Sequence, residues 1–271
     1  MTTLSPKCNE VFSHVEFCPS NRIHSHSHSP PQLFLVRPKY LLSHPRFSFV
    51  IFYLCFNQIY NNLVSQAGQM NLHHIPNDAI QAMNGIACVL LGPLIQSIYP
   101  LLAKYKIPFG PIARITVAYL TMGIAMGYAA LAQQLIYNTG PCYTSPLACP
   151  ASNNGALPNN ISIFTQAPIY FILAVAEILG FVTASEYAYS KSPRNMKSIV
   201  QAFTQFTAAV GSALGIAISP VAVDPKLVVM YACLAGVMGV ATVGFWWVFK
   251  GVDREREGEG DGVDGELNVP G

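Results

Sequence analysis

The chain has 271 residues, of which 52% are hydrophobic and only 10% are charged. Soluble domains carry about 25% charged residues, so this composition excludes an ordinary soluble globular protein and favours an integral membrane protein. The formal net charge of +2 favours no class of partner, but Lys and Arg are absent between Phe47 and Ala103 and between Ile115 and Ser190. A water-exposed surface over stretches of that length would need charged side chains.

Residues 1–47 form a low-complexity segment rich in His, Ser and Pro, with alternating histidines from His24 to His28. No clean apolar run follows a basic start, so the segment does not resemble a signal peptide. Alternating histidines could bind a metal ion, but a segment this polar predicts a disordered tail. The abrupt change of composition near Ser48 predicts that this segment is unrelated sequence, joined to a genuine membrane domain by a mispredicted gene model.

Six apolar stretches follow, each long enough to cross the roughly 30 Å hydrocarbon core of a bilayer as a helix. They are Phe49–Met70, Ala79–Ala103, Pro111–Tyr137, Tyr170–Ala188, Met196–Ser219 and Leu227–Phe249. The first has a polar second half, beginning at Asn57 and Gln58, that should not face lipid. We therefore expect an all-α membrane protein with a six-helix transmembrane bundle over 48–250 and an acidic, disordered cytoplasmic tail over 251–271.

The fourth span carries a carboxylate, Glu177, near its middle, where a charge is costly and needs a partner or a water-filled cavity. Small residues share its side of the helix, at Ala174, Gly180 and Ala184, so this face should look into the bundle. A midplane anion that faces a bundle suits the binding of a cationic group in a low dielectric. A protonated glutamate that is hydrogen-bonded within the bundle is the alternative. The fifth span holds a further small-residue contact face that includes Gly211.

All the Lys and Arg residues except Lys226 fall on one side of the membrane if the chain has six spans. Basic residues collect on the cytoplasmic side of membrane proteins, so both termini should be cytoplasmic. Glu186 lies near the cytoplasmic end of the fourth span and close to Lys191. We expect these two residues to form an ion pair or a gate contact rather than to bind a ligand.

The longest loop, about Asn138–Asn160, is extracytoplasmic on this assignment. It contains Cys142 and Cys149, which predict a disulfide in an oxidising compartment. Asn160 begins an N-glycosylation sequon on the same side. Three further cysteines lie in apolar runs and are predicted to be small buried side chains: Cys55, Cys88 and Cys233.

Several short runs are informative together because of their order and spacing between about Phe52 and Lys250. They are Asn57-Gln58, Ser65-Gln66-Ala67-Gly68-Gln69-Met70, Pro76-Asn77-Asp78, Pro111-Ile112-Ala113-Arg114, Gln133, Gln166-Ala167-Pro168-Ile169-Tyr170, Ala176-Glu177-Ile178 and Glu186-Tyr187-Ala188-Tyr189-Ser190-Lys191. In this arrangement the chain resembles the C-terminal half of a fungal-type proton-dependent oligopeptide transporter, a family of the major facilitator superfamily. The six spans would be the family's helices seven to twelve.

The resemblance implies symport of di- and tripeptides, with protons as the coupling ion and no bound cofactor or metal. It implies that Glu177 pairs with the amino terminus of the peptide, that Asn84 contacts the bound peptide, and that Asn57 and Gln58 line the cavity. An interhelical hydrogen bond alone would also explain Asn84. We expect di- and tripeptides and the lipid bilayer as partners, and the plasma membrane as the location, with the vacuolar membrane as the alternative.

Transporters of this superfamily need two six-helix halves with the substrate between them. The family's first half carries an acidic cluster in helix one that has no counterpart in residues 1–45, so we expect a fragment that is inactive without a missing N-terminal half or another copy. The alternative is a non-transporting half-transporter that binds or regulates a full-length relative. An enzyme is disfavoured because the spans hold no His/Cys metal-ligand spacing and no Ser-His-Asp set, and no basic face suggests nucleic acid.

Overall fold

The computed structural model describes residues 45–72, 76–105, 109–153, 157–191 and 197–266, and side chains from 48 to 249 except those of 77, 78, 190 and 191. The helices are α2 (Pro45–Phe56), α3 (Asn62–Gly68), α4 (Ala82–Lys104), α5 (Pro111–Asn138), α6 (Ala167–Glu177), α7 (Thr183–Lys191), α8 (Lys197–Ile218) and α9 (Leu227–Glu266). Short 3-10 segments are η2 (Asn57–Ile59), η3 (Asn77–Gln81), η4 (Pro150–Ser152), η5 (Ile163–Gln166) and η8 (Ser219–Val221), and η6 (Ile178–Val182) is π-helical. The low-complexity segment expected over 1–47 lies outside the described residues up to residue 44.

Five helical runs in the described part of the chain are long and apolar enough to cross a membrane. They are Ala79–Lys104, Pro111–Asn138, Ile163–Tyr189, Lys197–Val221 and Leu227–Phe249. These runs coincide with the second to sixth spans predicted from the sequence. The chain is therefore an all-α, multi-pass membrane protein, as predicted.

The first expected span is not a single continuous helix, which is why five runs and not six are long and apolar enough to cross a membrane. α2 ends at Phe56, η2 follows as one tight turn, and the exposed residues Tyr60 and Asn61 separate it from α3. Asn61 has φ −109° and ψ −82°, which is not helical. We call this interruption, residues 57–61, the helix break.

Two amide side chains explain the helix break. Asn57 Nδ2 donates to the carbonyl oxygen of Tyr53 at 2.8 Å, and Gln58 Nε2 donates to that of Leu54 at 3.0 Å. These bonds satisfy carbonyl groups that the end of a helix leaves without backbone partners. Non-helical backbone is tolerated at membrane depth where protein buries it or where it lines a water-filled cavity. Gln58 is only 1% exposed, whereas Tyr60 and Asn61 are exposed.

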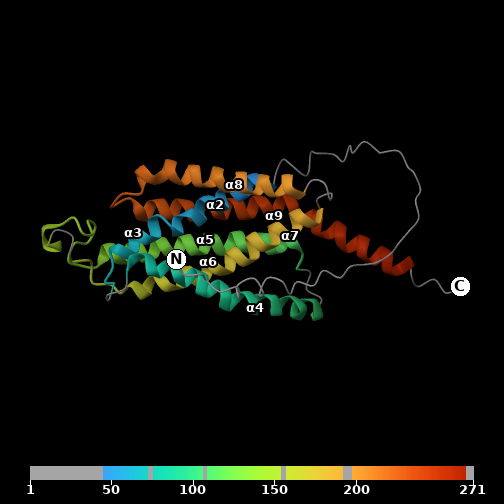
Figure 1. The fold of residues 1–271 in the computed structure, drawn as a ribbon, viewed down its shortest axis with the longest axis horizontal. Helices are drawn as coiled ribbons and strands as arrows, with labels where there is room; N and C mark the ends of the chain where they lie inside the picture. Colours follow the sequence, from blue (N-terminus) through green and yellow to red (C-terminus); the bar gives the residue numbers. More distant parts are fainter. Residues whose placement is uncertain (1–44, 73–75, 106–108, 154–156, 192–196, 267–271) are drawn as a thin grey trace, which may run out of the picture. The chain divides into compact units, whose positions relative to one another are not determined.

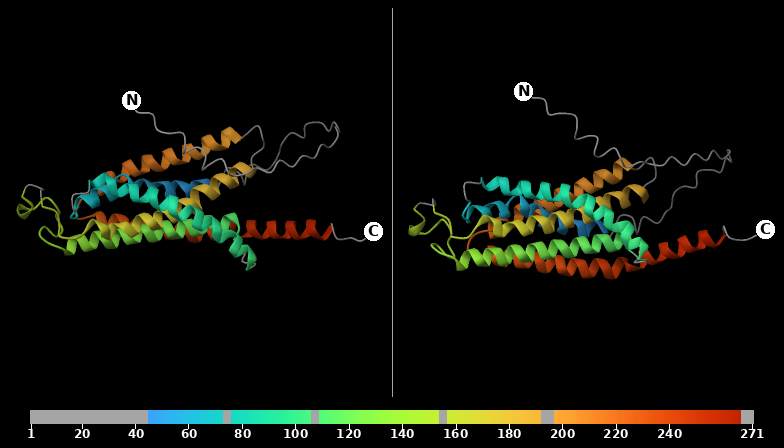
Figure 2. Two further views of the ribbon diagram at one scale, coloured as in Figure 1. Left: turned by 60° about the horizontal axis from the view of Figure 1, so that its bottom comes forward. Right: turned by 90° about the horizontal axis from the view of Figure 1, so that it is seen from below.

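The helices pack as a bundle in which α5 lies along α9 and against α6, α2 packs on α8, and α4 packs on α6 (Figures 1 and 2). Aromatic rings fill the space between α2, α5 and η6: Phe52 stacks on Tyr119 with centroids 5.6 Å apart and meets Phe181 edge-on at 5.1 Å. Gly180 makes room for this cluster, because a Cβ at that position would lie 3.0 Å from Phe52 and 3.3 Å from Ala118. The small-residue face beside Glu177 thus packs into the bundle, as predicted.

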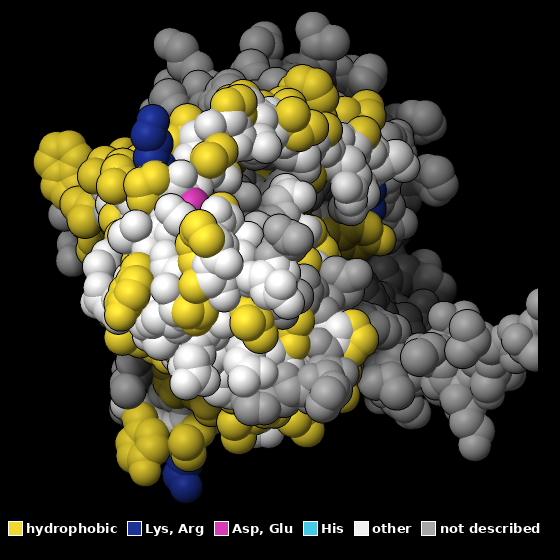
Figure 3. All heavy atoms as spheres, turned by 90° about the vertical axis from the view of Figure 1, so that its left-hand side faces the viewer, with side chains coloured by type: hydrophobic (Ala, Val, Ile, Leu, Met, Phe, Trp, Pro, Cys, Tyr) yellow, Lys and Arg dark blue, Asp and Glu magenta, His cyan; other side chains and the backbone are white. Residues whose placement is uncertain are grey.

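The connections fall at two opposite ends of the bundle (Figure 1). The α4–α5 and α7–α8 links lie at one end, flanked by Lys104, Arg114 and Lys197. The loop between α5 and η5 and the link between α8 and α9, which contains Lys226, lie at the other end. Figure 3 views this second end, where the coloured atoms include few charged side chains. Among the described residues, Lys104, Arg114 and Lys197 lie at one end and Lys226 at the other, in agreement with the sequence, and the cytoplasmic location of the basic end stays a prediction.

The last helix extends farther than the sequence suggested. α9 runs without interruption from Leu227 to Glu266, whereas the sequence predicted a disordered tail over 251–271. Extending an existing helix requires no new nucleation, and the Arg and Glu residues between 254 and 259 are good helix formers. The structure thus continues α9 over 251–266, the disorder of the tail stays a prediction, and 267–271 lie outside the described residues.

Candidate functional site

The candidate site is centred on Glu177, which ends α6 at the junction with the π-helical segment η6. Within the apolar run Ile163–Tyr189, Glu177 lies fourteen residues from the start and twelve from the end, close to its middle. A π-helical insertion changes the direction of the following side chains and is frequent at functional sites. The carboxylate is partly buried, so it needs partners from neighbouring helices.

Both partners of the Glu177 carboxylate come from α4. Asn84 Nδ2 donates to Oε1 at 2.7 Å, and Cys88 Sγ donates to Oε2 at 3.7 Å. The two donors are four residues apart, so they lie on one face of α4, one turn from each other. Each carboxylate oxygen therefore has a donor from the same helix.

Asn84 has a second feature, an unused acceptor. Its side chain is 7% exposed, and Oδ1 has no hydrogen-bond partner among the described residues. A buried acceptor without a donor is costly, and it lies beside a carboxylate that also only accepts when ionised. Such a pair of acceptors is suited to a ligand that brings several N–H donors and a positive charge, as an ammonium group does.

The structure brings together Glu177 and Asn84, two of the four predicted substrate-binding residues. It also adds Cys88, which the sequence placed among the small buried side chains. The spacing of four residues between Asn84 and Cys88 was the available signal. Of the other two cysteines in apolar runs, Cys55 is buried as predicted, whereas Cys233 is exposed, so that prediction was wrong.

Asn57 and Gln58 have other partners in this structure. Asn57 Nδ2 donates to Ser212 Oγ of α8 at 3.0 Å, and Gln58 Oε1 accepts a hydrogen bond from Asn62. Neither amide is among the hydrogen-bond partners of Glu177 in the described part of the chain. Both residues hold the helix break together, and their contact with a substrate stays a prediction.

The predicted gate pair lies in α7. Glu186 is exposed in the first turn of this helix, and Lys191 is its last residue. Residues five apart on an α-helix point in directions about 140° from each other, so the helix itself does not bring them together. The side chain of Lys191 lies outside the described residues, and the ion pair stays a prediction.

The loop between α5 and η5 contains both predicted modification sites. Cys142 and Cys149 are joined by a disulfide, with Cα atoms 5.5 Å apart. Asn160 is exposed, which keeps its side chain accessible, and its glycosylation stays a prediction. Asn159 is fully buried and ties the loop to the end of α5 by donating to the carbonyl oxygen of Ile136 at 2.8 Å.

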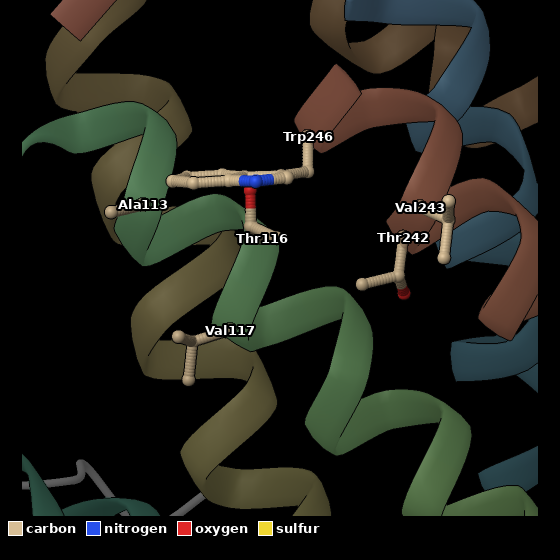
Figure 4. Close-up of a pocket in the computed structure, with 6 residues that line it drawn as sticks. All are labelled: Ala113, Thr116, Val117, Thr242, Val243 and Trp246. Atoms are coloured by element: carbon tan, nitrogen blue, oxygen red, sulfur yellow. The ribbon is translucent and has the colours of Figure 1, made fainter. Parts of the chain in front are cut away.

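An open groove of about 410 Å³ lies between α5 and α9, away from Glu177 (Figure 4). Its lining residues are Ala113, Thr116, Val117, Thr242, Val243 and Trp246. The two threonine hydroxyls donate to carbonyl oxygens of their own helices, at 2.8 Å and 2.7 Å. The groove therefore offers apolar surface but no charged group, so Glu177 is the better candidate for binding a polar ligand.

Among the described side chains, no group of three or more His, Cys, Asp or Glu residues is arranged to hold a metal ion.

Comparison with known proteins gives matches over most of this chain. The model of the POT family (PTR2) matches residues 46–237. Peptide transporter imqD of Aspergillus flavus is 52% identical over 211 residues, which cover 76% of this chain and 52% of the relative. Peptide transporter PTR_C of Candidozyma auris is 43% identical over 80% of this chain, and the probable peptide transporter ptr2 of Schizosaccharomyces pombe is 41% identical over 76%. The chain spans about half the length of the first of these relatives and 39% and 33% of the other two.

Two solved structures share the fold. The crystal structure of an auto-inhibited POT family peptide transporter aligns with a TM-score of 0.58 at 22% identity, over 78% of this chain and 39% of that chain. The POT family transporter PepTSo aligns with a TM-score of 0.60 at 19% identity, over 78% of this chain and 41% of that chain. At these identities the likeness shows the fold alone, which agrees with the helical architecture described above.

Proposed function

The chain belongs to the POT family, and on this premise we propose that it forms part of a proton-coupled symporter of di- and tripeptides. The names of its relatives support peptides as the substrate class. Because the chain spans only part of the length of these relatives, we propose that it supplies one half of the transport unit. The other half comes from a missing N-terminal six-helix segment or from another copy, with the substrate between the two.

Glu177 is the proposed contact for the amino terminus of the peptide. The observation that carries this role is the hydrogen bond from Asn84 Nδ2 to the mid-span carboxylate, which leaves Asn84 Oδ1 as an unused acceptor. An incoming ammonium group replaces the weak thiol donor of Cys88 at Oε2 and satisfies both acceptors. Charge attraction is stronger in such a setting than in bulk water, which compensates for the loss of hydration.

Asn57 and Gln58 are proposed to line the same cavity from the helix break, once a substrate or the second half is in place. The coupling ion is the proton, with no bound cofactor. We place the protein in the plasma membrane with both termini in the cytoplasm, because the basic residues flank one end of the bundle.

The test compares Glu177→Gln with a control variant in a fungal strain without peptide uptake. The chain is expressed together with the segment of the Aspergillus flavus relative that it does not match. We expect Glu177→Gln to lower uptake of labelled dialanine by tenfold or more, about 1.4 kcal/mol, because the neutral amide cannot pair with the ammonium group. Gln134→Leu changes an exposed side chain of α5 that bonds Asn138 of the same helix; it is the control and should transport like the original chain. Equal uptake by all three proteins would remove Glu177 from the site.

A second candidate function is a non-transporting half that binds or regulates a full-length relative. Two of the membrane-spanning runs are largely uncovered within this chain: 11% of the apolar segment is buried in Ala79–Lys104 and in Lys197–Val221, against 50% in Pro111–Asn138. This exposed surface favours association with another protein, whether the pair transports or the chain only regulates its partner. Co-expression with an intact relative separates the two functions. A regulatory half changes uptake by the relative even when it carries Glu177→Gln, whereas a transporting half does not.

A further inference from the structure

Four glutamines form a hydrogen-bonded chain at the end of the bundle that holds the disulfide loop. Gln166 Nε2 donates to Gln66 Oε1 at 2.9 Å, and Gln66 Nε2 donates to Gln133 Oε1 at 2.9 Å. Gln133 Nε2 donates to Gln69 Oε1 at 2.7 Å. Gln69 Nε2 then donates to Asp224 Oδ2 at 2.9 Å. Each amide donates to the next, so the whole chain points toward the carboxylate.

The members of this chain come from separate elements and are withdrawn from solvent. Gln66 belongs to α3, Gln69 follows directly as the C-cap of that helix, Gln133 belongs to α5 and Gln166 to η5, and all four are at most 4% exposed. Asp224 lies between η8 and α9, and its other oxygen accepts a hydrogen bond from the Tyr137 hydroxyl. Bonds to a charged acceptor are stronger than neutral ones, and aligned amides polarise one another. We call these four glutamines and Asp224 the amide clasp.

The amide clasp holds the far end of α3, the helix that follows the helix break, and a separate contact holds its start. Gln69 ties the end of α3 to Asp224, and the start of α3 is held through Asn62, whose amide lies 3.6 Å from Met230 Sδ in α9. Backbone bonds support the same end, because Asn71 N–H donates to the carbonyl oxygen of Ile161 at 2.8 Å. The position of α3 along the bundle is thus fixed by polar contacts at both of its ends.

A hydrophobic core alone would not fix this position so sharply. Apolar side chains tolerate small shifts, whereas a buried amide that loses its partner is left unsatisfied in a low dielectric. A one-residue slide or a rotation of α3 would break several bonds of the clasp at once. The clasp therefore selects one register of α3, and with it one placement of the helix break.

We propose that Asp224 is a positioning residue: through the aligned amides it holds α3, and with it the helix break that carries Asn57 and Gln58, in register against α5 and η5. The effect on peptide binding rests on the proposed function. The clasp itself does not.

Hydrogen exchange of the full 271-residue chain in detergent tests the clasp. We compare the original chain with Asp224→Ala, which removes the acceptor of both Gln69 and Tyr137. We expect amides of α3 and of residues 159–163 to exchange about tenfold faster, while those of α8 stay within about twofold. Unchanged exchange in α3, or a uniform rise over all helices, would overturn the proposal.

Two neighbouring glutamines provide a matched control. Gln133→Leu breaks the clasp in its middle and should reproduce the Asp224→Ala pattern. Gln134→Leu changes an exposed side chain that donates to Asn138 of the same helix, and it should leave exchange in α3 unchanged. If Asp224→Ala does not fold, the exchange experiment uses Asp224→Asn, which keeps an acceptor for Gln69 but loses the charge. Its α3 amides should exchange about threefold faster, and equal rates would overturn the proposal.

Binding of dialanine tests the positioning role. The dissociation constant of Asp224→Asn should rise about fivefold, since Asp224 touches no peptide and acts only through the position of the helix break. Equal affinity would contradict the positioning role while faster exchange would still support the clasp. If the original chain with its second half does not bind dialanine, the proposed function fails, and the exchange experiment alone decides the clasp.

Discussion

Gly211 of α8 lies directly against Tyr53 of α2: a Cβ built at position 211 would be 2.5 Å from the Tyr53 Cβ and 3.0 Å from the carbonyl oxygen of Val50. Real side chains do not approach so closely, so the two helices meet here because position 211 has no side chain. The next residue of α8, Ser212, accepts the hydrogen bond from Asn57. The contact thus combines a close backbone approach with a polar bond beside the helix break.

The first prediction is that Gly211→Ala lowers the thermal stability of the chain in detergent. The added methyl group would force α2 and α8 apart, at a cost of about 1 to 3 kcal/mol that exceeds the gain in helix propensity. Gly236→Ala is the control, because a Cβ there meets nothing within 4 Å. It should be neutral or stabilising by up to about 1 kcal/mol. Equal melting temperatures for the two variants would contradict the close contact.

This contact belongs to the part of the fold that the sequence could predict. Gly211 and Gly215 are four residues apart in an apolar helix, and small residues at that spacing signal a helix interface without any knowledge of the partner. The five continuous spans were predictable for a similar reason, since each is a long apolar run with its own local signal. Glu177 stood out because an isolated carboxylate in such a run needs an explanation.

The helix break was not predictable, because it depends on contacts between distant parts of the chain. The first span has the composition of a membrane helix up to Phe56. Whether Asn57 and Gln58 continue it or cap it depends on the partners that α8 and α3 supply. Cys88 was missed for the same reason, since its role appears only when α4 packs against α6. Local pattern predicted the elements, and tertiary contacts decided how two of them end.

A second prediction concerns the coupling between Asn84 and Glu177. In a double-mutant cycle with Asn84→Leu and Glu177→Leu, unfolding in detergent should give an interaction free energy of about 1 kcal/mol. The reason is that Asn84→Leu removes the donor of Glu177 Oε1 and Glu177→Leu removes the acceptor of the buried Asn84 amide, whereas the double change removes both groups. The exposed pair Gln134 and Asn138, 3.3 Å apart on α5, is the control and should couple by no more than about 0.5 kcal/mol. An interaction free energy of zero between Asn84 and Glu177 would show that the hydrogen bond is not formed.

A third prediction is that Asn159→Ala loosens the disulfide loop without unfolding the helices. The buried Asn159 side chain donates to the carbonyl oxygens of Ile136 and Tyr143 and accepts from the Cys142 N–H at 3.2 Å. Its removal leaves backbone groups unpaired, at about 1 to 3 kcal/mol for each one that stays buried. Limited proteolysis should cut the loop between α5 and η5 several times faster, while the helical circular dichroism is unchanged. Asn160→Ala, at the exposed neighbouring position, should be cut at the original rate, and equal rates for both variants would rule out this anchoring.

A fourth prediction concerns which end of the bundle faces the outside. Cys142 and Cys149 lie at one end, and Ser198 lies in the first turn of α8 at the other. In a chain whose remaining cysteines are replaced by alanine, a membrane-impermeant maleimide should label intact cells only after the disulfide is reduced. A thiol introduced by Ser198→Cys, in a chain without Cys142 and Cys149, should be labelled only after the cells are permeabilised. The physical reason is that basic residues such as Lys104 and Lys197 hold their end of the bundle in the cytoplasm. Labelling of position 198 in intact cells would reverse the orientation, and labelling of Cys142 without reduction would mean that the disulfide does not form.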